Sequence, residues 1–202
     1  MPRRCAVRIV GGLHRGRKLR VPPGKSTRPT TERVREALFN VLGPTVQGRA
    51  VLDLYAGSGA LGIEALSRGA ARVVFVEMGR AAADVIRGNL DGLQLPEPQV
   101  AQVVQRAIER SLDQLRSLGP FDLCLVDPPF ASVRDGTALR VVEQVVDAGI
   151  IAPDGLMILE FPSDQPDPTF RALACEEIRS YGDTRLAFLR PTTEHRDNAL
   201  GD

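Results

Sequence analysis

Residues 123–130 of the 202-residue chain are LCLVDPPF, an apolar run that ends in an acid, two prolines and an aromatic ring. Four successive apolar residues are typical of a strand buried in a parallel sheet. Because proline lacks a backbone N–H, the strand must end where the two prolines begin. A simple strand-ending turn would account for the prolines. The acid and the ring beside them indicate a second interpretation, a site that holds a flat base by its amino group.

The residues from Asp127 onward have the chemistry to hold an exocyclic amine. The lone pair of such an amine is delocalised into the base, and acceptors for its two N–H bonds return electron density to the nitrogen. Asp127 offers a carboxylate, and Pro128 keeps its carbonyl. Proline also holds the preceding residue extended, and stacking of Phe130 on the base is worth about 1–3 kcal/mol. We predict that Asp127, Pro128, Pro129 and Phe130 are the catalytic residues.

A second motif, LDLYAGSGALG at residues 52–62, lies between an expected strand and an expected helix. Its last six residues fit GxGxxG, and Glu77 ends the next strand at a separation suited to a ribose-binding acid. This spacing also fits a dinucleotide. Asp53 argues against one, because a carboxylate just before the loop would repel a pyrophosphate and suit an ammonium or a sulfonium. S-adenosylmethionine carries both cations and no phosphate, so we predict it as the cofactor.

The predicted cofactor-binding residues follow three successive strands. Glycines in the loop after the first strand let the backbone approach a ligand closely. After the third strand, the side-chain carbonyl of Gln105 or the backbone near Ala107 could accept a bond from the adenine amino group. The full predicted set is Asp53, Tyr55, Ala56, Gly57, Ser58, Gly59, Glu77, Met78, Gln105, Arg106 and Ala107.

From residue 50 onward, expected strands alternate with expected helices. The strands are expected at 50–55, 72–77, 99–105, 121–126 and 155–161, and the helices at 60–68, 80–92, 107–118 and 136–149. This alternation is typical of a doubly wound parallel sheet. Two further strands, near 174–180 and 184–190, flank a hairpin-tip sequence, YGDT. We therefore expect an antiparallel pair at the end of the sheet.

Positive charge is concentrated at the start of the chain. Residues 1–42 hold 11 Lys and Arg against 2 Glu, although the net charge of the whole chain is only +1. The pattern predicts a hairpin over residues 7–22 and a helix that begins at Thr30 or Thr31 and ends near Leu42. A solvated basic arm is one interpretation. Segregated charge of this kind favours the other, a surface that binds a polyanion.

Composition excludes several classes of protein. Cys5, Cys124 and Cys175 are odd in number and show no CxxC spacing, which argues against a disulfide framework or a zinc site. His14 and His195 are far apart and belong to no ligand cluster, so we expect no metal. No apolar run approaches the roughly 20 residues that span a bilayer, and the start of the chain lacks a signal-peptide pattern. A cytoplasmic protein is expected.

Three quoted segments resemble the class I S-adenosylmethionine-dependent methyltransferases: the loop DLYAGSGALGIEALSRGA, the strand end FVE and the DPPF motif. The segment RIVGGLHRGRKLRVPPGKSTRPTTERVREALFNVL and the late YGDT narrow the resemblance. Over residues 8–190 the chain is similar to the RsmD family, the bacterial 16S rRNA guanine-N2 methyltransferases.

The resemblance implies a Rossmann-like α/β fold, in which a doubly wound seven-stranded methyltransferase sheet has an antiparallel last strand and an N-terminal β-hairpin extension precedes it. The expected domains are a basic RNA-binding extension over 1–45, a methyltransferase domain over 46–191 and a flexible tail over 192–202. The predicted RNA-binding residues are Arg15, Arg17, Lys18, Arg20, Arg28, Arg33, Arg35 and Tyr181.

The implied activity is methyl transfer to the exocyclic N2 of a guanine in 16S rRNA, within the small ribosomal subunit or its assembly intermediate. The enzyme would act as a monomer. DPPF by itself separates neither guanine from other bases nor RNA from DNA. Two alternatives stay open, a DNA adenine-N6 methyltransferase and a non-catalytic RNA-binding assembly factor. A separate base-recognition domain would support the first, and the chain has no room for a large one. An assembly factor would have no need of Asp53, Glu77 and Asp127 together.

Overall fold

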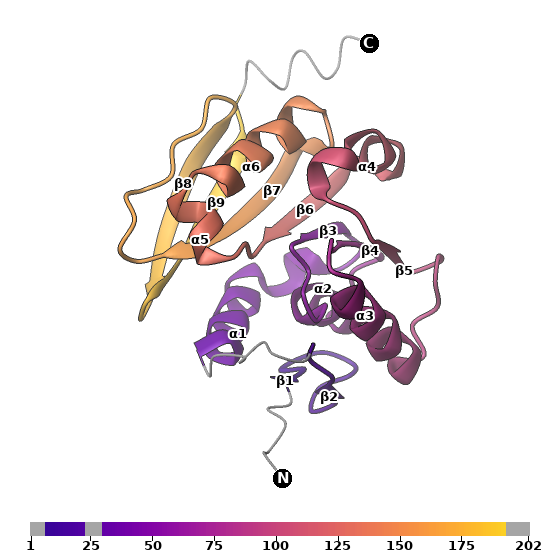
Figure 1. The fold of residues 1–202 in the computed structure, drawn as a ribbon. Helices are drawn as coiled ribbons and strands as arrows, with labels where there is room; N and C mark the ends of the chain where they lie inside the picture. Colours follow the sequence, from indigo (N-terminus) through magenta and orange to yellow (C-terminus); the bar gives the residue numbers. More distant parts are fainter. Residues whose placement is uncertain (1–6, 23–29, 193–202) are drawn as a thin grey trace. The chain divides into compact units, whose positions relative to one another are not determined.

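The computed structural model describes residues 7–22 and 30–192 (Figure 1). Its contacts divide the chain into two compact units, Met1–Arg106 and Ala107–Asp202. Within the described residues, none of the helices has the length and apolar character needed to cross a bilayer.

The first unit carries the hairpin and two β-α-β steps. Its elements are β1 (Val7–Arg8), β2 (Lys18–Leu19), α1 (Thr30–Leu42), the 3-10 helix η1 (Gly43–Val46), β3 (Ala50–Leu54), α2 (Ala60–Ser67), β4 (Arg72–Val76), α3 (Arg80–Leu93) and β5 (Ala101–Val104). Strand β4 lies between β3 and β5 and is parallel to both. Such strands are buried on both faces and read as apolar runs. Accordingly, Leu52, Leu54 and Phe75 are fully buried.

The chain forms a sheet of seven strands, and the second unit carries four of them. Its elements are the 3-10 helix η2 (Ile108–Arg110), α4 (Leu112–Leu118), β6 (Phe121–Val126), α5 (Phe130–Arg134), α6 (Thr137–Asp147), β7 (Ile151–Pro162), β8 (Leu173–Tyr181) and β9 (Thr184–Pro191). Strand β6 is parallel to β7, and β9 is antiparallel to both β7 and β8. Tyr181 pairs with Thr184 at the predicted hairpin tip.

The predicted fold class is confirmed. The sheet strands number three in the first unit and four in the second, they are mostly parallel, and a small β1–β2 hairpin precedes them. This is the α/β arrangement expected from the alternation of strands and helices. The antiparallel end of the sheet is also as predicted, because β9 runs against both of its neighbours.

Two elements of the second unit have bounds that differ clearly from the predictions. A single helix was expected over 107–118, but the chain forms η2 and α4 instead, with a break at Ser111, which is buried. The Ser111 hydroxyl donates to the Ala107 carbonyl at 2.8 Å and so competes with helical hydrogen bonding. Strand β7 starts at Ile151 rather than residue 155, since a register shift against β6 accommodates the intervening proline and glycine.

The short helix α5 was not predicted. Five residues are too few for a helical period to show in the sequence. The helix begins directly after Pro129, whose φ of −54° is already compatible with a helix. The Pro129 carbonyl accepts hydrogen bonds from the Ser132 backbone N–H at 2.8 Å and its hydroxyl at 2.7 Å. The DPPF motif is therefore a corner between a buried strand and a helical turn.

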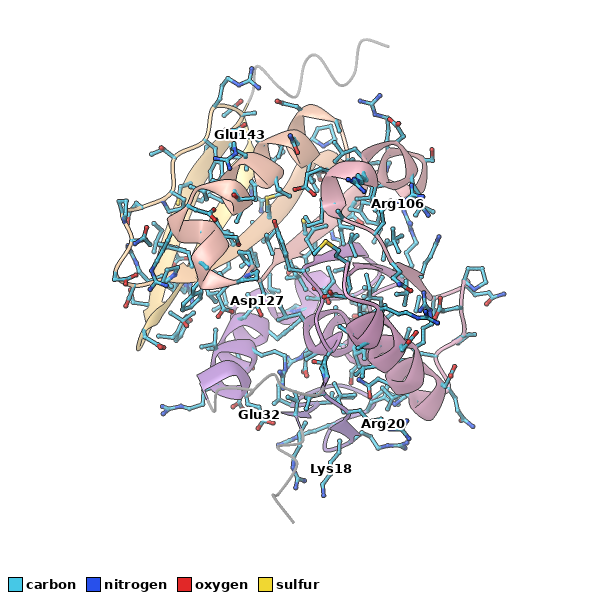
Figure 2. All side chains as sticks on the ribbon, viewed as in Figure 1. Lys18, Arg20, Glu32, Arg106, Asp127 and Glu143 are labelled. Carbon is cyan, nitrogen blue, oxygen red and sulfur yellow. The ribbon has the colours of Figure 1, made fainter. Side chains whose placement is uncertain are left out.

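The β1–β2 ladder is shorter than predicted, with two residues in each strand. Residues between the strands form a compact loop that has its own backbone bonds, from the Ile9 N–H to the Arg17 carbonyl at 3.0 Å and from the Gly16 N–H to the Ile9 carbonyl at 2.8 Å. We call residues 7–22 the hairpin. Figure 2 labels Lys18, on β2, and Arg20, which directly follows β2.

Candidate functional site

The candidate functional residues form two groups, and each group is described within its own unit. The first is the glycine-rich loop, residues 55–59, between β3 and α2. Tyr55, Gly57 and Gly59 have φ values of 59°, 59° and 77°. An L-residue in this left-handed region costs about 1–2 kcal/mol, so Tyr55 holds a strained conformation that its surroundings impose. Strain of this kind concentrates at functional sites.

Acceptors of the protein itself occupy backbone donors in this loop and in the first turn of α2. The Gly57 N–H donates to Glu77 Oε2 at 2.8 Å, and the Gly62 N–H donates to Asp53 Oδ2 at 2.9 Å. The Gly59 N–H donates to the Ala56 carbonyl at 2.7 Å. A pyrophosphate would need such N–H groups for itself. The loop is therefore unsuited to a dinucleotide, which supports the choice of S-adenosylmethionine on geometric as well as charge grounds.

Asp53 lies beneath the loop. Its side chain is 1% exposed, and its bond to Gly62 holds the first turn of α2, where a negative charge is favoured by the helix dipole. Gly62 has no room for a side chain, since a Cβ there would lie 2.3 Å from Phe75 Cε1 and 2.8 Å from Val73 Cγ1. Asp53 therefore shapes the loop and places negative charge under it.

Glu77 ties the ends of two strands to the loop. Its half-buried carboxylate accepts the Gly57 N–H through one oxygen and the Gly79 N–H, at 2.7 Å, through the other. Each carboxylate oxygen has two lone pairs, so capacity remains for the two hydroxyls of a ribose. The Glu77 N–H donates to the Val104 carbonyl at 3.1 Å, which joins the end of β4 to the end of β5. The Glu77 carboxylate therefore fits the ribose of the predicted cofactor.

The remaining predicted cofactor residues have different surroundings. Met78 is 73% exposed beside Glu77, so its thioether is available to a flat ring. Gln105 is exposed and accepts a bond from Arg87 Nη1 at 3.5 Å, and Arg106 is also exposed. The Ala107 carbonyl belongs to the second unit and accepts the Ser111 hydroxyl there. Their cofactor contacts stay predictions.

The second group of candidate residues is the DPPF corner in the second unit. Asp127 and Phe130 are half-buried, Pro128 is buried and Pro129 is exposed (Figure 2 labels Asp127). The corner immediately follows the four buried residues of β6 that the sequence predicted. A half-buried carboxylate on a rigid corner is held in a fixed orientation, which is what the positioning of a bound base requires.

Arg134, which the sequence analysis missed, supports the ring of Phe130. Its guanidinium carbon lies 5.9 Å from the ring centroid, within the range of a cation–π contact. Arg134 Nη2 also pairs with Asp164 Oδ2 at 2.8 Å, and this bond lowers the pKa of the exposed Asp164 carboxyl. The i, i+4 spacing of Phe130 and Arg134 on a helix was the signal available in the sequence.

The hairpin presents its positive charges to solvent. Arg15, Arg17, Lys18 and Arg20 are all exposed. The hairpin is fixed to the end of α2, because the Leu13 N–H donates to the Ser67 carbonyl at 2.7 Å, and the Ser67 hydroxyl accepts the His14 N–H at 2.9 Å. The same hydroxyl donates to the Gly11 carbonyl at 2.6 Å. A rigid, exposed set of cations is what contact with phosphates requires.

Arg35 does not belong with these cations. Its side chain is 4% exposed, its Nη2 donates to the Arg8 carbonyl, and its Nε lies 3.7 Å from Glu64 Oε2. Burial lowers the pKa of the guanidinium, against the opposing effect of Glu64. Buried in this way, Arg35 has no surface for a phosphate, so we remove it from the RNA-binding set and assign it to the packing of α1 on α2.

The other predicted RNA contacts are placed as follows. Arg33 is exposed on α1, and Tyr181 is half-buried at the β8–β9 tip of the second unit. Arg28 lies outside the described residues. In the described part of the chain, no group of three His, Cys, Asp or Glu side chains could hold a metal ion.

The fold and the two groups of candidate residues define a class I S-adenosylmethionine-dependent methyltransferase. A family model described as conserved hypothetical protein 95 matches residues 7–190. The chain belongs to this family, the RsmD family. This membership confirms the predicted family and the predicted cofactor.

Relatives share most of their length with the chain. The ribosomal RNA small subunit methyltransferase D of Escherichia coli K12 is 40% identical over 167 residues, which is 82% of this chain and 80% of the relative. The protein of the same name from Haemophilus influenzae is 38% identical, over 79% of this chain and 81% of the relative. The solved Escherichia coli protein yhhF is 37% identical, with a TM-score of 0.78 over 92% of this chain and 98% of that one.

Proposed function

We propose that the protein transfers a methyl group from S-adenosylmethionine to the exocyclic N2 of a guanine in 16S rRNA. The observation that carries the proposal is the DPPF corner, where a half-buried carboxylate and a supported aromatic ring follow a buried strand. Relatives that are 38–40% identical carry the name ribosomal RNA small subunit methyltransferase D, which supports rRNA as the substrate.

In this proposal Asp127 and Pro128 prepare the amine. S-adenosylmethionine would supply an electrophilic methyl group, whose bond to the sulfonium sulfur breaks as its bond to the amine nitrogen forms, so that a neutral thioether leaves. The Asp127 carboxylate accepts one N–H bond of the guanine amine, and the Pro128 carbonyl accepts the other. Both acceptors raise electron density on the nitrogen and fix the direction of its lone pair. The proton that the amine loses on methylation leaves along its hydrogen bond to Asp127.

The aromatic ring and the cofactor residues have complementary tasks. Phe130 stacks on the face of the extruded base, and Arg134 restricts the motion of the ring. In the first unit, Glu77 binds the ribose hydroxyls and Met78 packs on the adenine. The glycine-rich loop, with negative charge beneath it from Asp53, receives the cationic part of the ligand.

The hairpin provides the affinity for RNA. Arg15, Arg17, Lys18 and Arg20 would bind phosphates of the 16S rRNA within the small subunit or its assembly intermediate. Contacts to phosphate are salt-dependent and carry little base information, so base choice falls to the second unit. We further propose that the enzyme acts as a monomer and without a metal.

The test offers tritiated S-adenosylmethionine and the purified protein to 30S particles, naked 16S rRNA and duplex DNA, followed by digestion and identification of the labelled nucleoside. N2-methylguanosine from either RNA sample is the expected product. N6-methyladenine from DNA would replace the proposal with the DNA methyltransferase alternative. Cofactor binding with no labelled product from any substrate would favour the non-catalytic assembly factor.

A matched pair of variants tests the role of Asp127. Asp127→Ala should lower turnover by at least about a hundredfold, within the range for loss of an acid–base group, while cofactor affinity is retained. Asp154→Ala removes an exposed carboxylate from β7 of the same unit and should leave turnover unchanged. Unchanged turnover in Asp127→Ala would refute the assignment of the DPPF corner.

A further inference from the structure

Asn89, on α3, joins the hairpin to the glycine-rich loop. Its Oδ1 accepts the Arg20 N–H at 2.8 Å, and its Nδ2 donates to the Arg20 carbonyl at 3.1 Å. The same nitrogen donates to the Ser58 carbonyl at 3.0 Å. One side chain therefore contacts the backbone of a predicted RNA-binding strand and the backbone of the predicted cofactor loop.

The burial and hydrogen bonding of the Asn89 side chain suit it to this linkage. Asn89 is 5% exposed, and all three of its bonds go to backbone groups that are far away in the sequence. A primary amide supplies two N–H donors and one carbonyl acceptor, and these bonds use both kinds of group. Aspartate at this position would keep the acceptor for the Arg20 N–H but would lose both donations.

The partners of Asn89 lie beside the groups that meet the ligands. The Arg20 side chain is exposed on the hairpin, next to the equally exposed Lys18. Ser58 lies between Gly57 and Gly59, both with positive φ, and the Gly57 N–H is held by Glu77. A displacement of either backbone changes the hydrogen bonds available to the other, because Asn89 has to satisfy both at once.

Another attachment of the hairpin, through Ser67, provides a comparison. Ser67 bonds to the backbone of Gly11, Leu13 and His14. Ser67 is the last residue of α2, whereas the glycine-rich loop precedes the first residue of that helix. Both attachments fix the hairpin, but the bonds of Asn89 extend to the loop as well.

We propose that Asn89 is a positioning residue that makes RNA binding and cofactor binding mutually dependent. Phosphates held by the hairpin fix the Arg20 backbone, Asn89 passes this constraint to the Ser58 carbonyl, and the glycine-rich loop is ordered for S-adenosylmethionine. The inference rests on the proposed function for its assignment of the hairpin to RNA. By linkage, each ligand must raise the affinity for the other by the same factor.

The test measures this coupling factor directly. Calorimetry gives the Kd of S-adenosylhomocysteine, which cannot donate a methyl group, with and without saturating 16S rRNA. Filter binding gives the Kd of the RNA with and without S-adenosylhomocysteine. For the wild type we expect each ligand to tighten the other by about fivefold or more, the lower end of typical couplings. In Asn89→Ala both ratios should fall to about one.

Two further variants separate positioning from stability. Ser67→Ala removes hairpin bonds without touching the loop, so it should weaken RNA binding but preserve the coupling factor. Asn89→Asp keeps the bond to the Arg20 N–H and loses both donations, so it should lose the coupling even if Asn89→Ala fails to fold. Asn89→Gln keeps the amide but places it one methylene further from the backbone. This variant should therefore show less than half of the wild-type coupling.

Distinct results separate this inference from the proposed function. A wild-type ratio of one, or equal loss of coupling in Ser67→Ala and the Asn89 variants, overturns the role of Asn89 while RNA binding and product identity stand. Absence of measurable RNA binding to the wild type overturns the RNA assignment itself, and the inference with it.

Discussion

The attachment of the hairpin to α2 can be tested with two glycines of one loop. Gly12 and Gly16 have φ values of 73° and 83°, so alanine pays a similar backbone penalty at each position. Their surroundings differ. A Cβ on Gly12 would lie 1.8 Å from the carbonyl oxygen of Ser67, whereas a Cβ on Gly16 would meet nothing within 4 Å. Gly16→Ala is therefore a matched control for Gly12→Ala.

The expected free energies differ by the cost of separating the hairpin from α2. A left-handed alanine costs about 1–2 kcal/mol, which is the whole effect expected for Gly16→Ala. Gly12→Ala must also break the three hydrogen bonds that join Ser67 to the backbone of Gly11, Leu13 and His14. At about 0.5–1.5 kcal/mol each, these bonds raise the expected cost for Gly12→Ala to about 2.5–6.5 kcal/mol.

The assay combines amide hydrogen exchange over the hairpin with RNA affinity. In Gly12→Ala we expect fast exchange at Leu13 and His14 and a loss of RNA affinity of at least about tenfold, while Gly16→Ala stays within about threefold of the wild type. Binding of S-adenosylhomocysteine in the absence of RNA should change little in either variant. Equal effects of the two substitutions would refute the reasoning, because the contact with the Ser67 and Arg68 backbone distinguishes them.

Two further predictions concern charge. A triple variant that replaces Arg17, Lys18 and Arg20 with Glu should weaken RNA binding. It should also lower the slope of log K against log salt by about 2, since each phosphate contact contributes about 0.7–0.9. An unchanged slope would show that the hairpin does not bind phosphates. Burial raises the pKa of the Cys175 thiol, so in a Cys5→Ser background its alkylation by iodoacetamide should reach half-maximal rate at a higher pH than for a free cysteine. A midpoint below that of the free thiol would contradict this direction.

Local patterns in the sequence predicted the elements that carry the site. The apolar run before Asp127 and the run before the glycine-rich loop are strands β6 and β3, with ends within one residue of those expected. The hairpin tip between Tyr181 and Thr184 also lies where the turn sequence placed it. These features depend on neighbours in the chain, through backbone sterics and burial period, so a sequence is sufficient to predict them.

Contacts between distant residues could not be predicted in this way. Asn89 bonds to Arg20 across 69 positions, and Glu64 accepts the Val10 N–H across 54. Nothing in the sequence near either residue indicates its partner. Arg35 is a different case, because it precedes Leu38 and Leu42 by three and seven positions and so shares their apolar helix face. Its place in the helical period was the available signal for its burial, although its charge led to its assignment to the RNA-binding set.

The crowding around Gly62 has a consequence for the use of glycine motifs as signatures. A side chain at this position would collide with Phe75, Val73 and Asp53, all of which belong to the strands under α2. The third glycine of GxGxxG is thus required by the close approach of a helix to its sheet, whatever molecule the protein binds. In proteins with this architecture, such a glycine therefore indicates how closely the helix packs on the sheet. The acids at positions such as Asp53 and Glu77 indicate which ligand the protein binds.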